Sequence, residues 1–99
     1  MSITILPSTI VVAAKNQVAC ELGDEAAILN LTTGVYYGLD PVGARIWKML
    51  GGPTTVADIR DALLRTYDVD AEQCERDLAA ILEKLDAEGL VELRAGHDS

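Results

Sequence analysis

The side chains that most often perform chemistry in proteins are scarce in this 99-residue chain. Its only histidine, His97, lies in a polar C-terminal segment, and its two cysteines, Cys20 and Cys74, lack the paired spacing of zinc and redox motifs. Nucleophilic and acid–base catalysis both need a base that is held beside the reacting group. We therefore expect a protein without enzymatic activity, metal site or cofactor, and with two buried free thiols.

Carboxylates are abundant in one segment near the C-terminus, but their spacing is that of an exposed helix face. Arg76 and Lys84 can pair with some of them along such a helix. We interpret the group as a solvated surface; it comprises Glu72, Glu75, Asp77, Glu83, Asp86 and Glu88.

The formal net charge of -8 disfavours whole classes of partner. Phosphate backbones and anionic membrane surfaces attract basic proteins, so we expect no nucleic acid and no membrane among the partners. The apolar run Ile3 to Val12 lacks a basic start, contains Pro7 and is too short to cross a bilayer. These features favour a mature cytoplasmic chain.

The elements that could position a binding site begin with short β-type runs. Val18 to Leu22, Ala26 to Leu31 and Val35 to Leu39 are of strand length and are separated by turn-forming residues. They predict a three-stranded antiparallel sheet. Thr9 to Ala13 is also β-prone, as an extra strand or an extended arm.

Helical spacing replaces this pattern after residue 40. Asp40 followed by Pro41 predicts a first helix to Leu50. Capping pairs of Thr55 with Asp58, and of Asp70 with Gln73, predict a second helix that ends near Tyr67 and a third that ends at Gly89. Leu90 to Leu93 can return as a short strand or wing.

This order of elements predicts an α+β fold that resembles a winged helix-turn-helix, with a three-stranded antiparallel sheet followed by three helices. Nothing resembling a linker interrupts the chain. We expect one domain over residues 18–93, preceded by an N-terminal arm or extra strand over residues 1–17 and followed by a polar tail over residues 94–99.

The last strand of the expected sheet offers a binding edge. One side of Val35 to Leu39 has no strand beside it, so its backbone groups can pair with a strand from another chain. An ordinary edge covered by the N-terminal arm or by a second copy of the protein is the alternative. Because side chains alternate along a strand, we expect Val35, Tyr37 and Leu39 to point inward, and Tyr36 and the bare backbone of Gly38 to be accessible.

A helix-turn-helix arrangement also suggests a transcriptional regulator. The second helix of that motif enters the major groove and places basic or amide side chains against bases and phosphates. Here the third helix carries six carboxylates against two basic residues. We keep an acidic winged-helix regulator of transcription or of protein–protein contacts as the alternative function.

The order and spacing of several short runs resemble the PqqD family. These runs are Gly34 to Trp47 (GVYYGLDPVGARIW), Thr55 to Ile59 (TVADI), Tyr67 to Asp70 (YDVD), Asp77-Leu78 and Gly89 to Val91, and the similarity covers roughly residues 18–93. The family includes the stand-alone RiPP recognition elements, or peptide chaperones, of pyrroloquinoline quinone and lasso-peptide pathways.

The resemblance implies that a precursor leader peptide adds as a strand beside the third strand and packs against the third helix. The implied partners are this leader and a modifying enzyme, either a leader peptidase with a cyclase or a radical SAM enzyme. A homodimer is compatible with this implication. The implied contacts are Val35, Tyr36, Tyr37 and Gly38 on the strand, and Cys74, Asp77, Leu78 and Ile81 on the helix.

Overall fold

The computed structural model describes residues 5–95 and contains two small sheets and three helices. The first sheet is antiparallel, with β2 (Gln17–Leu22), β3 (Glu25–Asn30) and β4 (Tyr36–Leu39) in that order. Turns at Gly23 and Gly34 join these strands, and both glycines have a positive φ that a side chain would strain. The predicted three-stranded sheet is thus confirmed.

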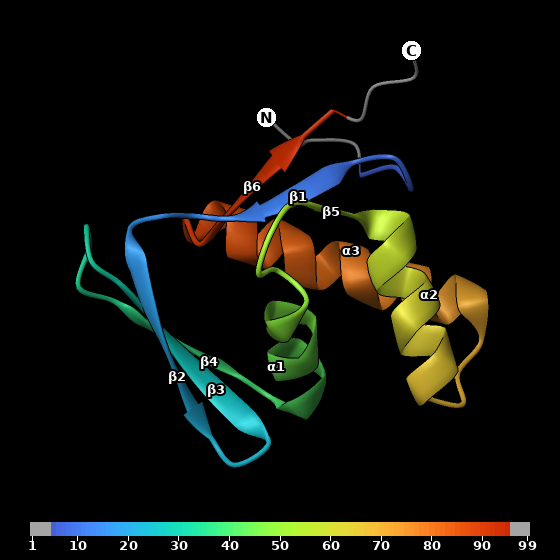
Figure 1. Ribbon diagram of the computed structural model, residues 1–99, viewed down its shortest axis with the longest axis horizontal. Coiled ribbons are helices and arrows are strands. Elements are labelled where there is room, and N and C mark those ends of the chain that lie inside the picture. The colour runs from blue at the N-terminus through green and yellow to red at the C-terminus, as the bar shows by residue number, and fades with distance from the viewer. Residues whose placement is uncertain (1–4, 96–99) are drawn as a thin grey trace.

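A second sheet is formed by segments that are distant in the sequence. β1 (Ile10–Ala13) pairs on one side with β5 (Thr54–Thr55) and on the other with β6 (Val91–Arg94), both antiparallel. Figure 1 shows these strands along one side of the molecule, away from the first sheet. The β-prone N-terminal segment is therefore a strand, and the wing predicted near residue 90 is its partner.

The first two helices begin where their caps predict. α1 (Pro41–Lys48) follows Asp40, whose carboxylate accepts a hydrogen bond of 2.8 Å from the Gly43 N–H. α2 (Val56–Thr66) follows Thr55, whose hydroxyl accepts one of 3.1 Å from the Asp58 N–H. Both caps satisfy a backbone donor that a helix start leaves without a partner.

The longest helix, α3 (Ala71–Ala87), crosses the centre of the molecule (Figure 1). The capping pair predicted at its start is wrong, because the Asp70 side chain makes no capping hydrogen bond. Gln73 instead donates to Asp77 one turn further along, at 2.9 Å. The predicted end is correct, since Gly89 has a positive φ and follows the last turn.

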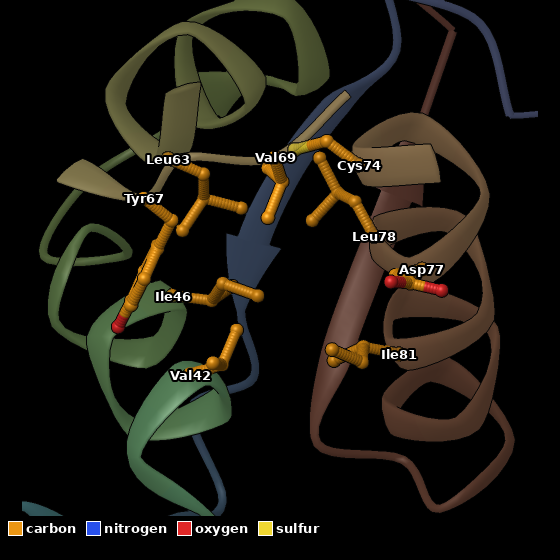
Figure 2. Close-up of a pocket in the computed structure, with 9 residues that line it drawn as sticks. All are labelled: Val42, Ile46, Leu63, Tyr67, Val69, Cys74, Asp77, Leu78 and Ile81. Carbon is orange, nitrogen blue, oxygen red and sulfur yellow. The ribbon is translucent and has the colours of Figure 1, made fainter. Parts of the chain in front are cut away.

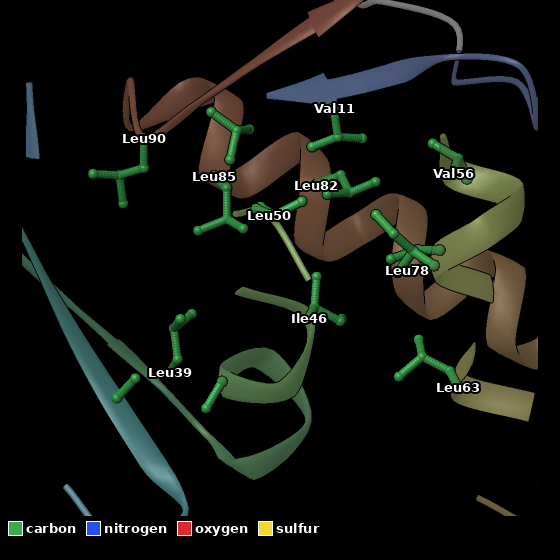
Figure 3. Packing of buried hydrophobic residues seen from close by; sticks show 14 of the residues in the cluster. Val11, Leu39, Ile46, Leu50, Val56, Leu63, Leu78, Leu82, Leu85 and Leu90 are labelled. Carbon is green, nitrogen blue, oxygen red and sulfur yellow. The ribbon is translucent and has the colours of Figure 1, made fainter. Parts of the chain in front are cut away.

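The hydrophobic core lies between α3 and the other elements. The face of α3 that is buried in this core consists of Cys74, Leu78, Leu82 and Leu85, at helical spacing. Figure 3 shows Val11 from β1, Ile46 from α1 and Leu63 from α2 directed toward this face. Aliphatic side chains therefore build the core, in which α3 packs against α2 and β6 while α1 packs against β3 and β4.

Two predictions of burial are wrong. Cys20 is exposed, because β2 lies at the outer edge of its sheet and Cys20 is on the face opposite to the buried Ile28, whereas Cys74 is buried as expected. Val35 is 51% exposed, because β4 begins only at Tyr36 and Val35 belongs to the preceding turn. The expectations for His97 and for the ends of the arm and tail lie outside the described residues.

Among residues 5–95, none of the helices has the length and apolar character that crossing a membrane would require.

Candidate functional site

The outer edge of β4 has backbone groups that no strand within residues 5–95 pairs with. Hydrogen-bonded pairs alternate along an antiparallel ladder, and the Asn30 N–H donates to the Val35 carbonyl at 3.0 Å. In this register Tyr37 and Leu39 bond to β3. The N–H and C=O groups of Tyr36 and Gly38 therefore point away from β3, toward the open edge of the sheet.

Side chains on β4 alternate as predicted from Tyr36 onward. Tyr36 is 71% exposed, whereas Tyr37 is partly buried against the core and Leu39 is buried. No atom lies within 4 Å of the position that a Cβ would take on Gly38. The face of the sheet at Gly38 is thus uncovered, and the strand order leaves the edge of β4 beside it without a partner strand.

An apolar pocket of about 140 Å³ lies where α1, α2 and α3 meet, and β4 leads directly into the first of these helices. Figure 2 shows side chains of α1 and the end of α2 on one wall, side chains of α3 on the opposite wall, and Val69 between them. The lining residues are Val42, Ile46, Leu63, Tyr67, Val69, Cys74, Asp77, Leu78 and Ile81.

A wider hollow of about 470 Å³ adjoins this pocket at Ile81, which lines both. Its other lining residues, including Lys84 and Ala87, follow one another along the exposed side of α3. We call the two hollows together the α3 groove. Its lining runs along α3 from Cys74 to Ala87, about 20 Å at 1.5 Å per helical residue, which suits an extended segment of several residues.

Asp77 is the carboxylate of the pocket. One of its oxygens, Oδ1, accepts the 2.9 Å hydrogen bond from Gln73, whose own carbonyl oxygen accepts one of 3.1 Å from Arg76. Within residues 5–95, no side-chain hydrogen bond reaches its other oxygen, Oδ2. Gln73 therefore orients the Asp77 carboxylate and leaves one oxygen for an incoming donor.

Asn30 fixes the position of the β2–β3–β4 sheet relative to α3. Its buried side chain donates a 2.9 Å hydrogen bond from Nδ2 to the Glu88 carbonyl at the end of α3. Its Oδ1 accepts from the Thr32 and Thr33 N–H groups in the turn before β4, at 2.9 and 3.2 Å. One side chain thus joins the start of β4 to the far end of the α3 groove.

We expect replacement of Asn30 by alanine to lower the free energy of unfolding by about 1–3 kcal/mol, because two turn N–H groups and a helix-end carbonyl lose their partner. Urea denaturation measures this change. Asn16→Ala is the control, since Asn16 makes an exposed hydrogen bond to Thr32 and its loss should change stability by about 0.5 kcal/mol or less. Equal effects of the two replacements would contradict the role given to Asn30.

The thiol of Cys74 lies in the pocket wall, where its surroundings disfavour the thiolate. Burial, followed by the negative charges of Asp77 and Glu75, raises its pKa above the ordinary value for cysteine, and Arg60 opposes this rise. A raised pKa leaves less thiolate at neutral pH, and thiolate is the reactive form. Cys74 therefore contributes a mainly apolar surface to the pocket wall.

We expect a thiol reagent such as DTNB to label Cys20 quickly and Cys74 at least about tenfold more slowly, because Cys74 reacts only when the chain opens locally. The absorbance time course at pH 8 should show one fast thiol per chain and a second that becomes fast in denaturant. Cys20→Ser should abolish the fast phase. Two fast thiols in the native chain would show that the pocket wall is not packed.

The structure brings the predicted helix residues together but adds a wall that the sequence did not indicate. Cys74, Asp77, Leu78 and Ile81 share one pocket, and Tyr36 and Gly38 lie on the open edge of β4. Sequence reasoning missed the residues of the opposite wall, namely Val42, Ile46, Leu63, Tyr67 and Val69. Val69 carried a usable signal, because an apolar residue between Asp68 and Asp70 in a loop is poorly explained by a core role.

Two solved structures are similar to this chain over most of its length. TbiB1 in complex with the TbiA(beta) leader peptide shares 37% sequence identity and a TM-score of 0.77, covering 89% of this chain and 99% of that one. Lasso peptide synthetase B1 complexed with the leader peptide shares 24% identity and a TM-score of 0.72, covering 83% and 96%. The second likeness shows the fold alone. No curated protein matches the chain.

The family described as coenzyme PQQ synthesis protein D (PqqD) matches residues 25–91. This range contains β3, β4 and all three helices, and so both the open edge of β4 and the α3 groove. Because the match spans more than half of the sequence, this chain belongs to the PqqD family.

Proposed function

We propose that this chain is an adaptor that binds the leader segment of a ribosomally made precursor peptide and presents the precursor to a modifying enzyme. The observation that carries the proposal is the open edge of β4, which leads into α1, together with the apolar hollows that line α3 and that α1 helps to form. The 37% identity to TbiB1, which binds a leader peptide in its solved complex, supports it.

The leader would bind as an additional strand. Tyr36 and Gly38 offer two N–H donors and two carbonyl acceptors at the β4 edge, and main-chain hydrogen bonds of this kind give affinity with little dependence on sequence. Alternate side chains of the guest strand would point toward the α3 groove. The pocket around Ile81 would take an apolar side chain, and Asp77 a hydrogen-bond donor or a basic group.

The adaptor would contribute position and no covalent chemistry. Holding the leader keeps the attached core peptide at a high effective concentration beside the enzyme, which we take to be a leader peptidase with a cyclase or a radical SAM enzyme. We place this encounter in the cytoplasm and the binding unit within residues 18–93. In the described chain, β1 pairs with β6 and so completes the fold around that unit.

Fluorescence polarisation tests the proposal directly. The labelled leader of the cognate precursor, with the TbiA(beta) leader as a second probe, should bind saturably, whereas labelled duplex DNA should not bind at physiological salt. Tight binding of DNA without binding of the cognate leader would instead favour the acidic winged-helix regulator.

Replacing Asp77 by alanine is expected to weaken leader binding about three- to tenfold, because the guest loses a charged hydrogen-bond partner at the pocket. The same polarisation titration measures the change. Glu72→Ala is the matched control: it removes one negative charge from α3 at a residue that lines neither hollow of the groove. Equal leader affinities of the two variants would show that Asp77 does not contact the leader.

A further inference from the structure

The residues that line the pocket between α1, α2 and α3 differ sharply in burial. Four of them, Ile46, Leu63, Cys74 and Leu78, are buried in the core. Val69 lines the same pocket but is 47% exposed, and Figure 2 shows it between the two walls. It is therefore an apolar side chain at the mouth of the pocket, and about half of it faces solvent.

This side chain belongs to a short segment, residues 67–70, that hydrogen bonds hold only at its ends. At one end the Tyr67 N–H donates to the Leu63 carbonyl at 2.8 Å, and at the other the Asp70 carbonyl accepts from the Cys74 N–H at 2.9 Å. Within residues 5–95, the backbone of the two residues between them makes no hydrogen bond. We call residues 67–70 the strap. Its middle can move without breaking a hydrogen bond.

The composition of the strap keeps its backbone at the surface. Asp68 and Asp70 are exposed on either side of Val69, and carboxylates without a partner stay in water. The pocket itself leaves a hollow of about 140 Å³ beside Val69. A hollow with an exposed apolar side chain at its mouth is complementary to an apolar side chain from another chain, because such a guest fills the first and covers the second.

Resting on the proposed function, we propose that Val69 is a specificity-determining residue of the leader site. The strap closes over the leader side chain that enters the pocket, and Val69 packs on that side chain and selects a bulky apolar one over a small or charged one. Closure follows entry, so the contact with Val69 acts on the rate at which the leader leaves more than on the rate at which it arrives.

Replacing Val69 by alanine should weaken leader binding about three- to tenfold, mainly through faster dissociation, because two methyl groups no longer cover the guest. Stopped-flow polarisation with the cognate and TbiA(beta) leaders measures both rates. Thr66→Ala is the matched control. It also removes two heavy atoms from an exposed residue beside the strap, but Thr66 lines neither hollow, and both rates should stay within about twofold of the original.

A double-mutant cycle identifies the leader residue that Val69 contacts. Each residue of the leader is replaced by alanine in turn, and its effect is measured on the intact chain and on Val69→Ala. One apolar leader residue should lose at least about threefold more affinity on the intact chain than on the variant, since the contact is already missing there. The other leader residues should have equal effects on both chains.

The preference between two leaders then tests selection, which a merely structural role of Val69 would not change. The second leader carries lysine at the position that the cycle identifies. The intact chain should prefer the apolar leader, and Val69→Glu should shift the ratio of the two affinities at least about tenfold toward the lysine leader. Ala71→Glu adds the same charge two residues away, lines neither hollow, and should leave the ratio within about threefold of the original.

The outcomes separate this proposal from the adaptor function. A leader that binds the intact chain, Val69→Ala and Val69→Glu equally, or an affinity ratio that Ala71→Glu shifts as much as Val69→Glu does, would overturn the role of Val69 and leave the adaptor function standing. A leader that does not bind the intact chain would overturn the adaptor function itself. A ratio that only Val69→Glu shifts supports both.

Discussion

Replacing Gly38 by proline is expected to weaken leader binding at least about tenfold and to leave the fold intact. The Gly38 N–H points to the open edge of β4, so proline removes a donor to the guest and no hydrogen bond to β3. The proline ring would also occupy the place of the guest backbone. Polarisation titration with the cognate leader measures the loss, and urea denaturation checks the fold.

Gly38→Ala is the matched control for this variant. Alanine keeps the N–H, and no atom lies within 4 Å of its added Cβ. Gly38 is also absent from the glycines with a positive φ, so alanine needs no strained backbone there. Alanine should therefore bind the leader within about threefold of the original chain. Equal losses for alanine and proline would mean that the open space at Gly38 matters and that its N–H does not.

Replacing Ile81 by glutamate is expected to reduce leader affinity about ten- to a hundredfold, because a guest side chain in the pocket would bury a charge without a partner. Ile81 is partly buried and is the residue at which the two hollows of the α3 groove meet. The affinity is measured by the same titration. Ala71→Glu adds an equal charge to α3 at a residue that lines neither hollow, and it should leave the affinity unchanged.

A second variant, Ile81→Ala, tests the same position if glutamate disturbs the packing of the protein. Alanine shortens the wall without adding a charge, so it should cost less affinity than glutamate while still weakening binding. If both Ile81 variants fold and bind the leader as the original chain does, the guest does not use the α3 groove.

Local signals in the sequence predicted most single elements correctly. The capping residues Asp40 and Thr55 mark the starts of α1 and α2 because each makes its hydrogen bond within three residues. The alternation of side chains along a strand is also a local property, and it correctly predicted that Tyr36 points outward and Leu39 inward. The error at Val35 is also local. The strand was predicted to begin at Val35 but begins one residue later, so Val35 lies in the preceding turn and is exposed.

The second sheet could not be predicted, because its pairs join distant segments. β1 pairs with β6 from the other end of the chain, and the third strand, β5, has only two residues. The missed pocket wall has a similar origin. Val42, Ile46 and Leu63 are spaced as ordinary core residues, and only packing of α1 and α2 against α3 leaves a cavity beside them.

Amide hydrogen exchange measured by NMR, with and without the cognate leader, tests strand addition most directly. Strand addition at β4 predicts that the leader slows exchange of the Tyr36 and Gly38 N–H groups strongly, while those of Tyr37 and Leu39, already bonded to β3, change little. A leader that binds without protecting Tyr36 and Gly38, or that protects Ala19 and Glu21 of β2 instead, would contradict the proposed site.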